Sequence, residues 1–376
     1  MGGGLMQLVA YGAQDIYLTG NPQITFFKVV YRRHTNFSME AIKQTWSGSD
    51  GVGARASGSC TATISRNGDL VHRMYLEIEG IPLAAANFNA AAITDVELEI
   101  GGQKIDKHTG HWMNVWAHLT EPNPSGHVGQ LDGGDQKGTL FQNMSGMGGS
   151  YGDEDTKVIT NVPLMFWFCR NPGLALPLIA LQYHEVKVIL NHDFSKGIKA
   201  ATTLARNNLW CDYIYLDTDE RRRFAQVSHE YLIEQLQFQS FSSATMDLNF
   251  NHPVKELIWT DSQWTGLSAD STATAATDIS TWLKVAGNAT WGAETTPVTT
   301  GRVPKTLTGN YQLKLNGHDR FKERDFRYFT RTQVWEHHTG NGGVQTTDSI
   351  GVYSFALKPE EHQPSGTCNF SRIDNA

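Results

Sequence analysis

The seven residues Val96-Glu97-Leu98-Glu99-Ile100-Gly101-Gly102 alternate apolar and acidic side chains and then end in two glycines. Because successive side chains of a β-strand point to opposite faces of its sheet, this pattern predicts a strand with one buried face. The glycine pair predicts a turn directly after that strand. The same alternation occurs at 74–79, 185–190 and 312–315. The chain is therefore predicted to consist mainly of half-buried strands.

Other segments extend this all-β prediction. Further strands are expected near 25–31, 37–46, 59–65, 164–169, 209–216, 231–241, 246–250, 254–260 and 351–357. Helical patterns are rarer: the apolar side chains of 112–119 share one helical face, and a second short helix is expected around 323–336. The run Asp217-Thr218-Asp219-Glu220 has the spacing of a capping box, which predicts a short helix through about Ala225.

The composition narrows the class of protein. A length of 376 residues is comfortable for two domains. With 10% aromatic and only 18% charged residues, the chain is neither disordered nor a long coiled coil. The net charge of −7 argues against a nucleic-acid-binding protein, which usually carries a basic patch. The densest basic run, Arg221–Arg223, is interpreted as a solvated helix face that supports a domain junction.

No residue is predicted to be catalytic, to bind a cofactor or to bind a metal. The four cysteines form no Cys-x-x-Cys pair and are expected to be free thiols. His108 and His111 lie near Asp106 without an evident third ligand, which indicates a polar surface turn and not a metal site. The run Gly148–Gly152 matches Gly-x-Ser-x-Gly inside a glycine-rich segment, without the flanking strand and helix that a nucleophile elbow needs.

Two carboxylates leave one enzymatic alternative open. Glu97 and Glu99 lie on the same face of their predicted strand, and paired carboxylates perform glycoside hydrolysis. A laminarinase-type motif would need a third carboxylate at the place of Gly102. The alternative function is therefore a carbohydrate-binding or glycoside-cleaving β-sandwich protein.

Four features recur in the same order in the two halves of the chain. The first half has a strand ending in glycine, a tryptophan-bearing helix, a glycine-rich loop and an aromatic strand, at Gly101-Gly102, Trp116, 120–156 and Phe166–Phe168. The second half repeats them at Asn316-Gly317, Trp335, Gly340–Gly343 and Val352–Phe355. This order predicts two copies of one β-domain. Asp217 lies 49 positions after Phe168 but only 21 residues follow Phe355, so the second copy is expected to lack a strand.

Five blocks of sequence resemble the major capsid proteins of nucleocytoplasmic large DNA viruses, which include the phycodnaviruses and mimivirus-like viruses. In chain order the blocks are Gly3–Phe27, Leu98–Asp106, Asp212–Ala225, Leu315–Phe321 and Asn369–Asn375. They follow the order of the family and span nearly the whole chain. The family normally continues past the last block with further strands, in agreement with the strand expected to be missing.

The resemblance implies two tandem jelly-roll β-sandwich domains, a double jelly roll. The expected parts are an N-terminal arm at 1–24, a first jelly roll at 25–217, a linker helix at 218–228 and a C-terminally incomplete second jelly roll at 229–376. The implied function is that of a structural protein, without enzymatic activity or cofactor, whose pseudo-hexameric homotrimers tile an icosahedral shell. The implied partners are neighbouring capsomers, minor capsid proteins and penton proteins, with an internal viral membrane nearby and no direct nucleic-acid contact. The implied location is the virion, after assembly in the host cytoplasm.

Overall fold

The protein is described by a computed structural model, which covers residues 6, 9, 12–14, 19–54, 56–82, 87–122, 139–148, 157–199, 204–240, 245–260, 307–340, 342 and 348–376. The chain divides into two units, Met1–Asn36 and Phe37–Ala376. In the first unit the strand expected at 25–31 is not formed, and Phe27 is 98% exposed. A β-pattern forms a strand only where a neighbouring strand pairs its N–H and C=O groups, and within this unit the described residues contain no strand.

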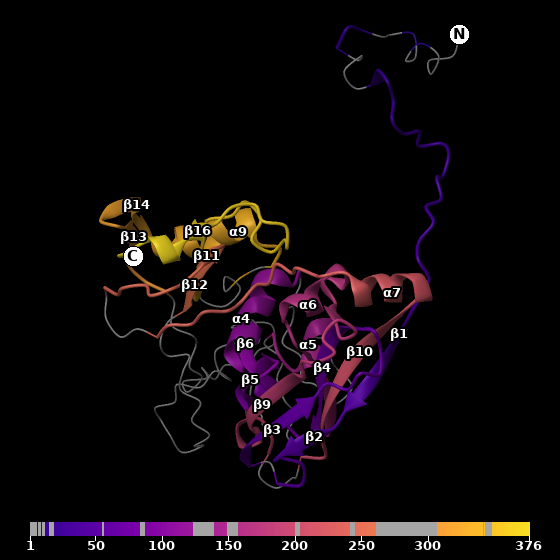
Figure 1. Ribbon diagram of the computed structural model, residues 1–376. Coiled ribbons are helices and arrows are strands. Elements are labelled where there is room, and N and C mark those ends of the chain that lie inside the picture. The colour runs from indigo at the N-terminus through magenta and orange to yellow at the C-terminus, as the bar shows by residue number, and fades with distance from the viewer. Residues whose placement is uncertain are drawn as a thin grey trace. The chain divides into compact units, whose positions relative to one another are not determined.

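The second unit begins with a sheet of five antiparallel strands, coloured indigo to rose in Figure 1. Its members are β1 (Phe37–Gln44), β4 (Leu70–Gly80), β7 (Val158–Pro163), β8 (Leu176–Pro177) and β10 (Arg206–Leu216). The strand order is β1-β10-β4-β7, and β8 pairs separately with β4. The long strands β4 and β10 therefore form the centre of the sheet, and β1 forms an edge.

A second five-stranded sheet contains the alternating run Val96–Ile100. Its members are β2 (Trp46–Gly48), β3 (Ser57–Thr63), β5 (Ile93–Ile100), β6 (Gln103–Thr109) and β9 (Val186–Asp193), in the order β2-β3-β9-β5-β6. Leu98 of β5 stands opposite Val188 of β9 and Asp106 of β6. Gly101 and Gly102 have φ values of 60° and 80°, which only glycine adopts without strain, and they form the tight turn between β5 and β6.

The two sheets face each other and enclose one core, as Figure 1 shows. The inward residues of each strand alternate with outward ones: Leu76 and Ile78 of β4 are at most 1% exposed, and so are Val188 and Leu190 of β9. Setting aside the short strands β2 and β8, the orders β1-β10-β4-β7 and β3-β9-β5-β6 are those of an eight-stranded jelly roll. The first jelly roll is thus confirmed.

Short helices cover the ends of this sandwich. They are α3 (Phe88–Ala92), α4 (Gly110–Thr120), α5 (Leu140–Ser145), α6 (Trp167–Arg170) and α7 (Thr218–Gln226), with the 3₁₀ turns η1 (Pro172–Leu174) and η2 (Phe194–Lys196). Helices α4 and α7 confirm two sequence predictions, although Asp217 accepts its hydrogen bond from the N–H of Thr218 and does not close a capping box.

Two sequence predictions in this half fail for identifiable reasons. The strand expected at 164–169 is wrong, because α6 begins at Trp167 and the buried aromatic side chains come from a turn of helix. Helix α5 was not expected within the glycine-rich segment 120–156. Its signal was a reciprocal capping box, in which Thr139 accepts from the N–H of Gln142 and the Gln142 side chain accepts from the N–H of Thr139.

The described residues of the second half form three antiparallel strand pairs. They are β11 (Pro253–Val254) with β16 (Cys368–Asn369), β12 (Glu256–Thr260) with β15 (Ile350–Ser354), and β13 (Asn310–Leu315) with β14 (His318–Asp325). Asn316 and Gly317, both at positive φ, close the β13–β14 hairpin in the manner of an Asn-Gly turn. The π-helical turn η5 (Tyr328–Thr332), the helix α9 (Gln333–His337) and the 3₁₀ turn η6 (Phe370–Arg372) complete this half.

Some expectations for the second half are corrected. The helix expected at 323–336 begins only after β14 ends at Asp325. The strands expected at 231–241 and 246–250 are not formed among the described residues. In their place the side-chain amides of Gln237 and Gln239 bond to the main chain of 247–251, at distances from 2.7 to 3.0 Å. The two glutamine side chains thus bond to main-chain N–H and C=O groups that would otherwise pair two strands.

Candidate functional site

The carboxylates considered for glycoside cleavage are held in ion pairs on the outer face of β5. Glu97 Oε1 lies 2.6 Å from Lys104 Nζ and 3.0 Å from Lys107 Nζ. Burial raises the pKa of Glu97, but the hydrogen bonds from the two lysines outweigh it and hold that pKa below its ordinary value. A glycosidase acid needs a raised pKa, so this environment argues against the enzymatic alternative.

The polar surface turn predicted around Asp106, His108 and His111 is wrong, because Asp106 and His108 are buried on strand β6 and His111 lies in helix α4. His108 Nε2 lies 2.9 Å from Asp106 Oδ2, and both side chains are almost fully buried. Among the residues that the structure describes, no group of three or more His, Cys, Asp or Glu side chains is placed to hold a metal ion. Cys60, Cys169, Cys211 and Cys368 are free thiols, as expected. The Gly148–Gly152 run lies outside the described residues beyond its first glycine.

The two halves meet at a junction between α4 of the first half and residues 334–340 and 342 of the second, which combines buried apolar side chains with hydrogen bonds. Val115 and Leu119 of α4 share one buried cluster with Val334 of α9 and with Ile350 and Val352 of β15. All five side chains are at most 3% exposed. Burial of apolar surface stabilises by about 25 cal/mol per Å² and is not directional. This cluster therefore holds the two halves together without fixing their orientation.

Directional contacts at the C-terminal end of α4 fix the junction. The last carbonyl groups of a helix have no partner within it. Here Gly340 N–H donates to Leu119 O at 2.7 Å, Gly342 N–H donates to His118 O at 2.8 Å, and the Thr339 hydroxyl donates to Thr120 O at 2.7 Å. The second half therefore caps a helix of the first half.

Glycine is required at position 340 by this close approach. A Cβ atom at Gly340 would lie 2.3 Å from His118 O and 2.6 Å from the carbonyl carbon of Leu119. Both are main-chain atoms, which cannot move aside as a flexible side chain can. The residue type at 340 thus sets how closely the two halves approach.

His338 adds a buried charge to the junction. Its side chain is fully buried, with Nε2 2.9 Å from Glu256 Oε2 and Nδ1 2.9 Å from Glu360 Oε1. Burial lowers the pKa of His338, but the hydrogen bonds to the two carboxylates outweigh it and raise that pKa to about 9. The imidazole is therefore a cation at neutral pH, and it crosslinks β12 to the segment after β15.

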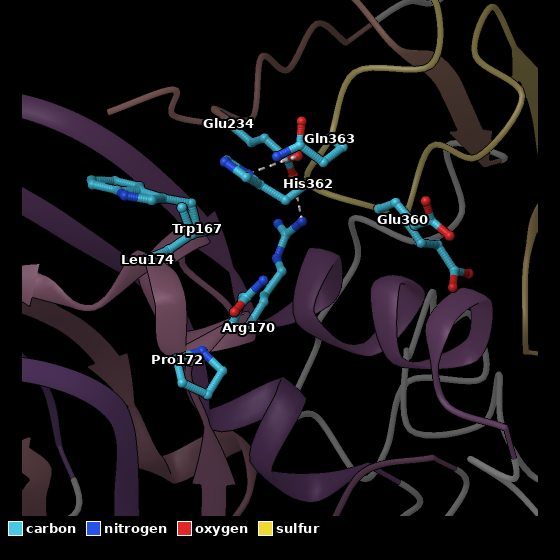
Figure 2. Close-up of a pocket in the computed structure, with 10 residues that line it drawn as sticks. Trp167, Arg170, Pro172, Leu174, Glu234, Glu360, His362 and Gln363 are labelled. Atoms are coloured by element: carbon cyan, nitrogen blue, oxygen red, sulfur yellow. Dashed lines mark hydrogen bonds and ion pairs between the residues drawn. The ribbon is translucent and has the colours of Figure 1, made fainter. Parts of the chain in front are cut away.

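A second line of contacts runs along 234–236. Glu234 Oε2 accepts from Arg170 Nη1 at 2.7 Å, and its other oxygen accepts from Lys255. Figure 2 shows Arg170 reaching toward Glu234 beside a pocket of about 400 Å³ that both halves line. The Leu236 N–H donates to Asp106 Oδ1 at 3.1 Å, so the buried Asp106–His108 pair also belongs to this attachment.

One of the three arginines in the basic run on α7 contacts the first jelly roll. Arg221 Nε lies 3.0 Å from Asp69 Oδ1, and Asp69 Oδ2 accepts from the N–H of Leu216 at 2.9 Å. This pair ties α7 to the first jelly roll. Arg222 and Arg223 are exposed, in agreement with the interpretation of a solvated helix face.

The tryptophan-bearing helices that were paired from the sequence share a longer repeated motif, which marks the junction. Residues Val115–Thr120 read Val-Trp-Ala-His-Leu-Thr, and Val334–Thr339 read Val-Trp-Glu-His-His-Thr. Each copy follows a hairpin whose turn contains glycine, β5–β6 in the first half and β13–β14 in the second. Both copies contribute to the same buried cluster. A comparison of the two halves residue by residue would have found it.

The comparisons with known proteins agree with this architecture. The family described as "Major capsid protein N-terminus" matches residues 25–217, and the family described as "Large eukaryotic DNA virus major capsid protein" matches residues 220–376. The chain belongs to the large eukaryotic DNA virus major capsid protein family. The resemblance read from the five sequence blocks is thereby confirmed, and the junction joins the two parts that the family models match.

Relatives within this family are similar over the full chain. The major capsid protein of Pyramimonas orientalis virus is 48% identical, with 100% of this chain and 91% of that protein covered. The major capsid protein of Paramecium bursaria Chlorella virus 1 is 44% identical, with 100% and 86% covered.

Solved structures of the family show the same fold. A chain of the PBCV-1 virus capsid superposes with a TM-score of 0.68 at 36% identity, covering 93% of this chain and 85% of that one. The Faustovirus major capsid protein superposes with a TM-score of 0.62 at 11% identity, which shows the fold alone. The fold class is therefore the expected double jelly roll. Among the described residues, no helix has the length and apolar character to cross a membrane.

Proposed function

We propose that this chain is the structural unit of an icosahedral shell, in which homotrimers of pseudo-hexagonal outline tile the surface of a large DNA virus. The observation that supports the proposal is the junction, at which buried apolar side chains and main-chain hydrogen bonds join the two halves of one chain. Three such chains present six similar lobes. A block of that kind fits lattice sites with six neighbours, where many individually weak contacts act together.

The proposed role is not enzymatic and needs no cofactor. Its partners are neighbouring capsomers, minor capsid proteins and penton proteins, with an internal membrane nearby and no direct contact with nucleic acid. Assembly takes place in the host cytoplasm, and the product is the virion. The proposed division is an arm at 1–24, jelly rolls at 25–217 and 229–376, and a linker helix at 218–228.

The mass and symmetry of the purified full chain test this proposal. Light scattering is expected to give three times the chain mass at micromolar concentration, and electron microscopy is expected to show a three-fold particle with six lobes. A stable monomer at that concentration would contradict the homotrimer. Hydrolysis of a β-glucan that is lost in both Glu97→Gln and Glu99→Gln would support the enzymatic alternative instead.

A further inference from the structure

A hollow of about 500 Å³ lies in the first half, where β1, β4 and β10 meet the loop after β2. Figure 1 shows these three strands side by side. Among the residues that line the hollow are Lys43 of β1, Glu77 of β4, Asn207 and Trp210 of β10, and Asp50 of the loop. None of its lining residues takes part in the junction between the halves, so the hollow belongs to the first half alone.

One buried polar group of this hollow is unsatisfied. The Asn207 side chain is only 2% exposed, and its Nδ2 donates to Asp50 O at 2.8 Å. Its Oδ1 accepts no hydrogen bond from the part of the chain that the structure describes. A buried acceptor without a partner is costly because it has lost its hydrogen bonds to water, and such groups are rare in folded proteins. A donor supplied by a ligand in the hollow would remove that cost.

Trp210 supplies an aromatic ring beside these polar groups. It stands directly opposite Tyr75 of β4, with the two ring centroids 6.4 Å apart and the ring planes 12° from parallel. The residues on either side of each ring in the sequence are at most 1% exposed in the core, so the half-buried rings lie on the outer face of the sheet. The Trp210 Nε1–H donates to Glu77 Oε2 at 2.5 Å and thereby fixes the indole.

The charges that line the hollow balance one another. The Arg206 guanidinium lies 3.2 Å from Glu77 Oε1, and Lys43 and Asp50 contribute one charge of each sign. A site for an anion such as phosphate would need an excess of cations. A neutral ligand rich in hydroxyl groups fits better, because a hydroxyl can donate to Asn207 Oδ1 and also accept from an ammonium or guanidinium group.

We propose that this hollow binds a neutral oligosaccharide, with one sugar ring packed on Trp210 and one hydroxyl group donating to Asn207 Oδ1. Sugar rings have C–H groups on their faces, which pack on aromatic rings, and hydroxyl groups at their edges, which both donate and accept. Small-molecule sites combine such an apolar wall with a few placed polar groups. The site requires neither the proposed homotrimer nor the glycoside-cleaving alternative, since Glu97 lies on β5 of the other sheet.

Titration with soluble sugars tests the proposal. The full chain, labelled with fluorotryptophan, is titrated with cellohexaose, laminarihexaose and mannohexaose while fluorine NMR is recorded. At least one of these sugars is expected to shift the Trp210 resonance, which Trp210→Phe assigns, with a Kd of about 1 mM or below. If none of the three shifts that resonance at about 10 mM, the proposal is overturned. This measurement on the wild-type chain does not depend on any variant that loses the ring.

Calorimetry with the sugar that binds then identifies the groups that hold it. Trp210→Ala is expected to raise the Kd by at least about 10-fold and Asn207→Ala by about 3-fold or more. Trp335→Ala removes a tryptophan of α9 that is 83% exposed, and this matched control should bind as the wild type does. Circular dichroism checks that each variant is folded. An unchanged Kd in folded Trp210→Ala would overturn the proposal, and a loss of binding in Glu97→Gln would do so by moving the sugar to β5.

Discussion

The two halves follow one order of elements but close their cores to different extents. Leu98 of β5 is 0% exposed between two five-stranded sheets, whereas its counterpart Leu313 of β13 is 8% exposed in a two-stranded hairpin. Among the described residues, the cluster around Leu313 has two other buried members, Phe329 and Tyr353, and the other apolar side chains packed against it are half-buried. Apolar side chains in similar alternating sequences are therefore buried to different extents, because the burial of a side chain depends on the strands packed over it.

The largest expected effect tests this difference directly. Leu98→Ala should lower the free energy of unfolding by about 3–5 kcal/mol, because the closed core leaves a cavity. Leu313→Ala should cost about 2 kcal/mol, since its half-buried neighbours can move into the space. Denaturant titration followed by tryptophan fluorescence measures both, with the exposed Leu140→Ala as control. Equal losses at 98 and 313 would show that the two cores are equally closed.

The next effect concerns the charge in the junction. The folded-state pKa of His338 is raised to about 9, so its stabilising contribution is complete below the ordinary value of 6.5 and is lost as the pH rises through 9. The wild-type free energy of unfolding should fall by about 3 kcal/mol between pH 6.5 and 9.5 on this account. His338→Gln should flatten that slope, and His318→Gln, an exposed histidine, should not. If the free energy of unfolding of His338→Gln depends on pH as steeply as that of the wild type, His338 is not a buried cation.

A smaller effect is expected where the halves touch through main-chain atoms. Gly340→Ala places a Cβ against His118 O and should destabilise the junction by about 1–3 kcal/mol. Gly173→Ala is the matched control, since its nearest atom would be a side-chain oxygen at 3.3 Å. Limited proteolysis after residue 217 and thermal unfolding both measure the result. If both alanines behave alike, the approach at 340 is looser than described.

The smallest effect should come from the outer face of the first half. Glu97→Gln removes the charge that Lys104 and Lys107 contact, yet the lysine side chains are 50% and 40% exposed. Exposed ion pairs contribute about 0–1 kcal/mol, so thermal unfolding should barely change. A loss as large as that of Leu313→Ala would mean that this face is buried against another chain under the conditions of measurement.

Particular elements show how far the sequence could be read. The strands at 74–79 and 185–190 and the helix at 112–119 were predicted because one face of each is buried over a regular period. The aromatic run at 164–169 misled, because three consecutive buried aromatic side chains fit a strand or a helical turn equally well. The periodicity of apolar residues could not predict the junction. Its key contacts are main-chain hydrogen bonds between residues more than 200 positions apart, which leave no local pattern.

The sequence by itself determined the all-β class, the duplication, the glycine turns and the family. The signals for them, which are alternating apolar residues, turn residues and blocks of family-like sequence in a fixed order, can all be read along the chain. The tertiary structure decided which copies of each pattern are buried. Trp116 and Trp335 occupy the same place in one repeated motif, yet one is 5% and the other 83% exposed. The physical reason is that burial depends on the pair of surfaces in contact and not on the residue alone. Trp116 packs against Trp112, Arg170 and His338, whereas Trp335 is exposed among the described residues.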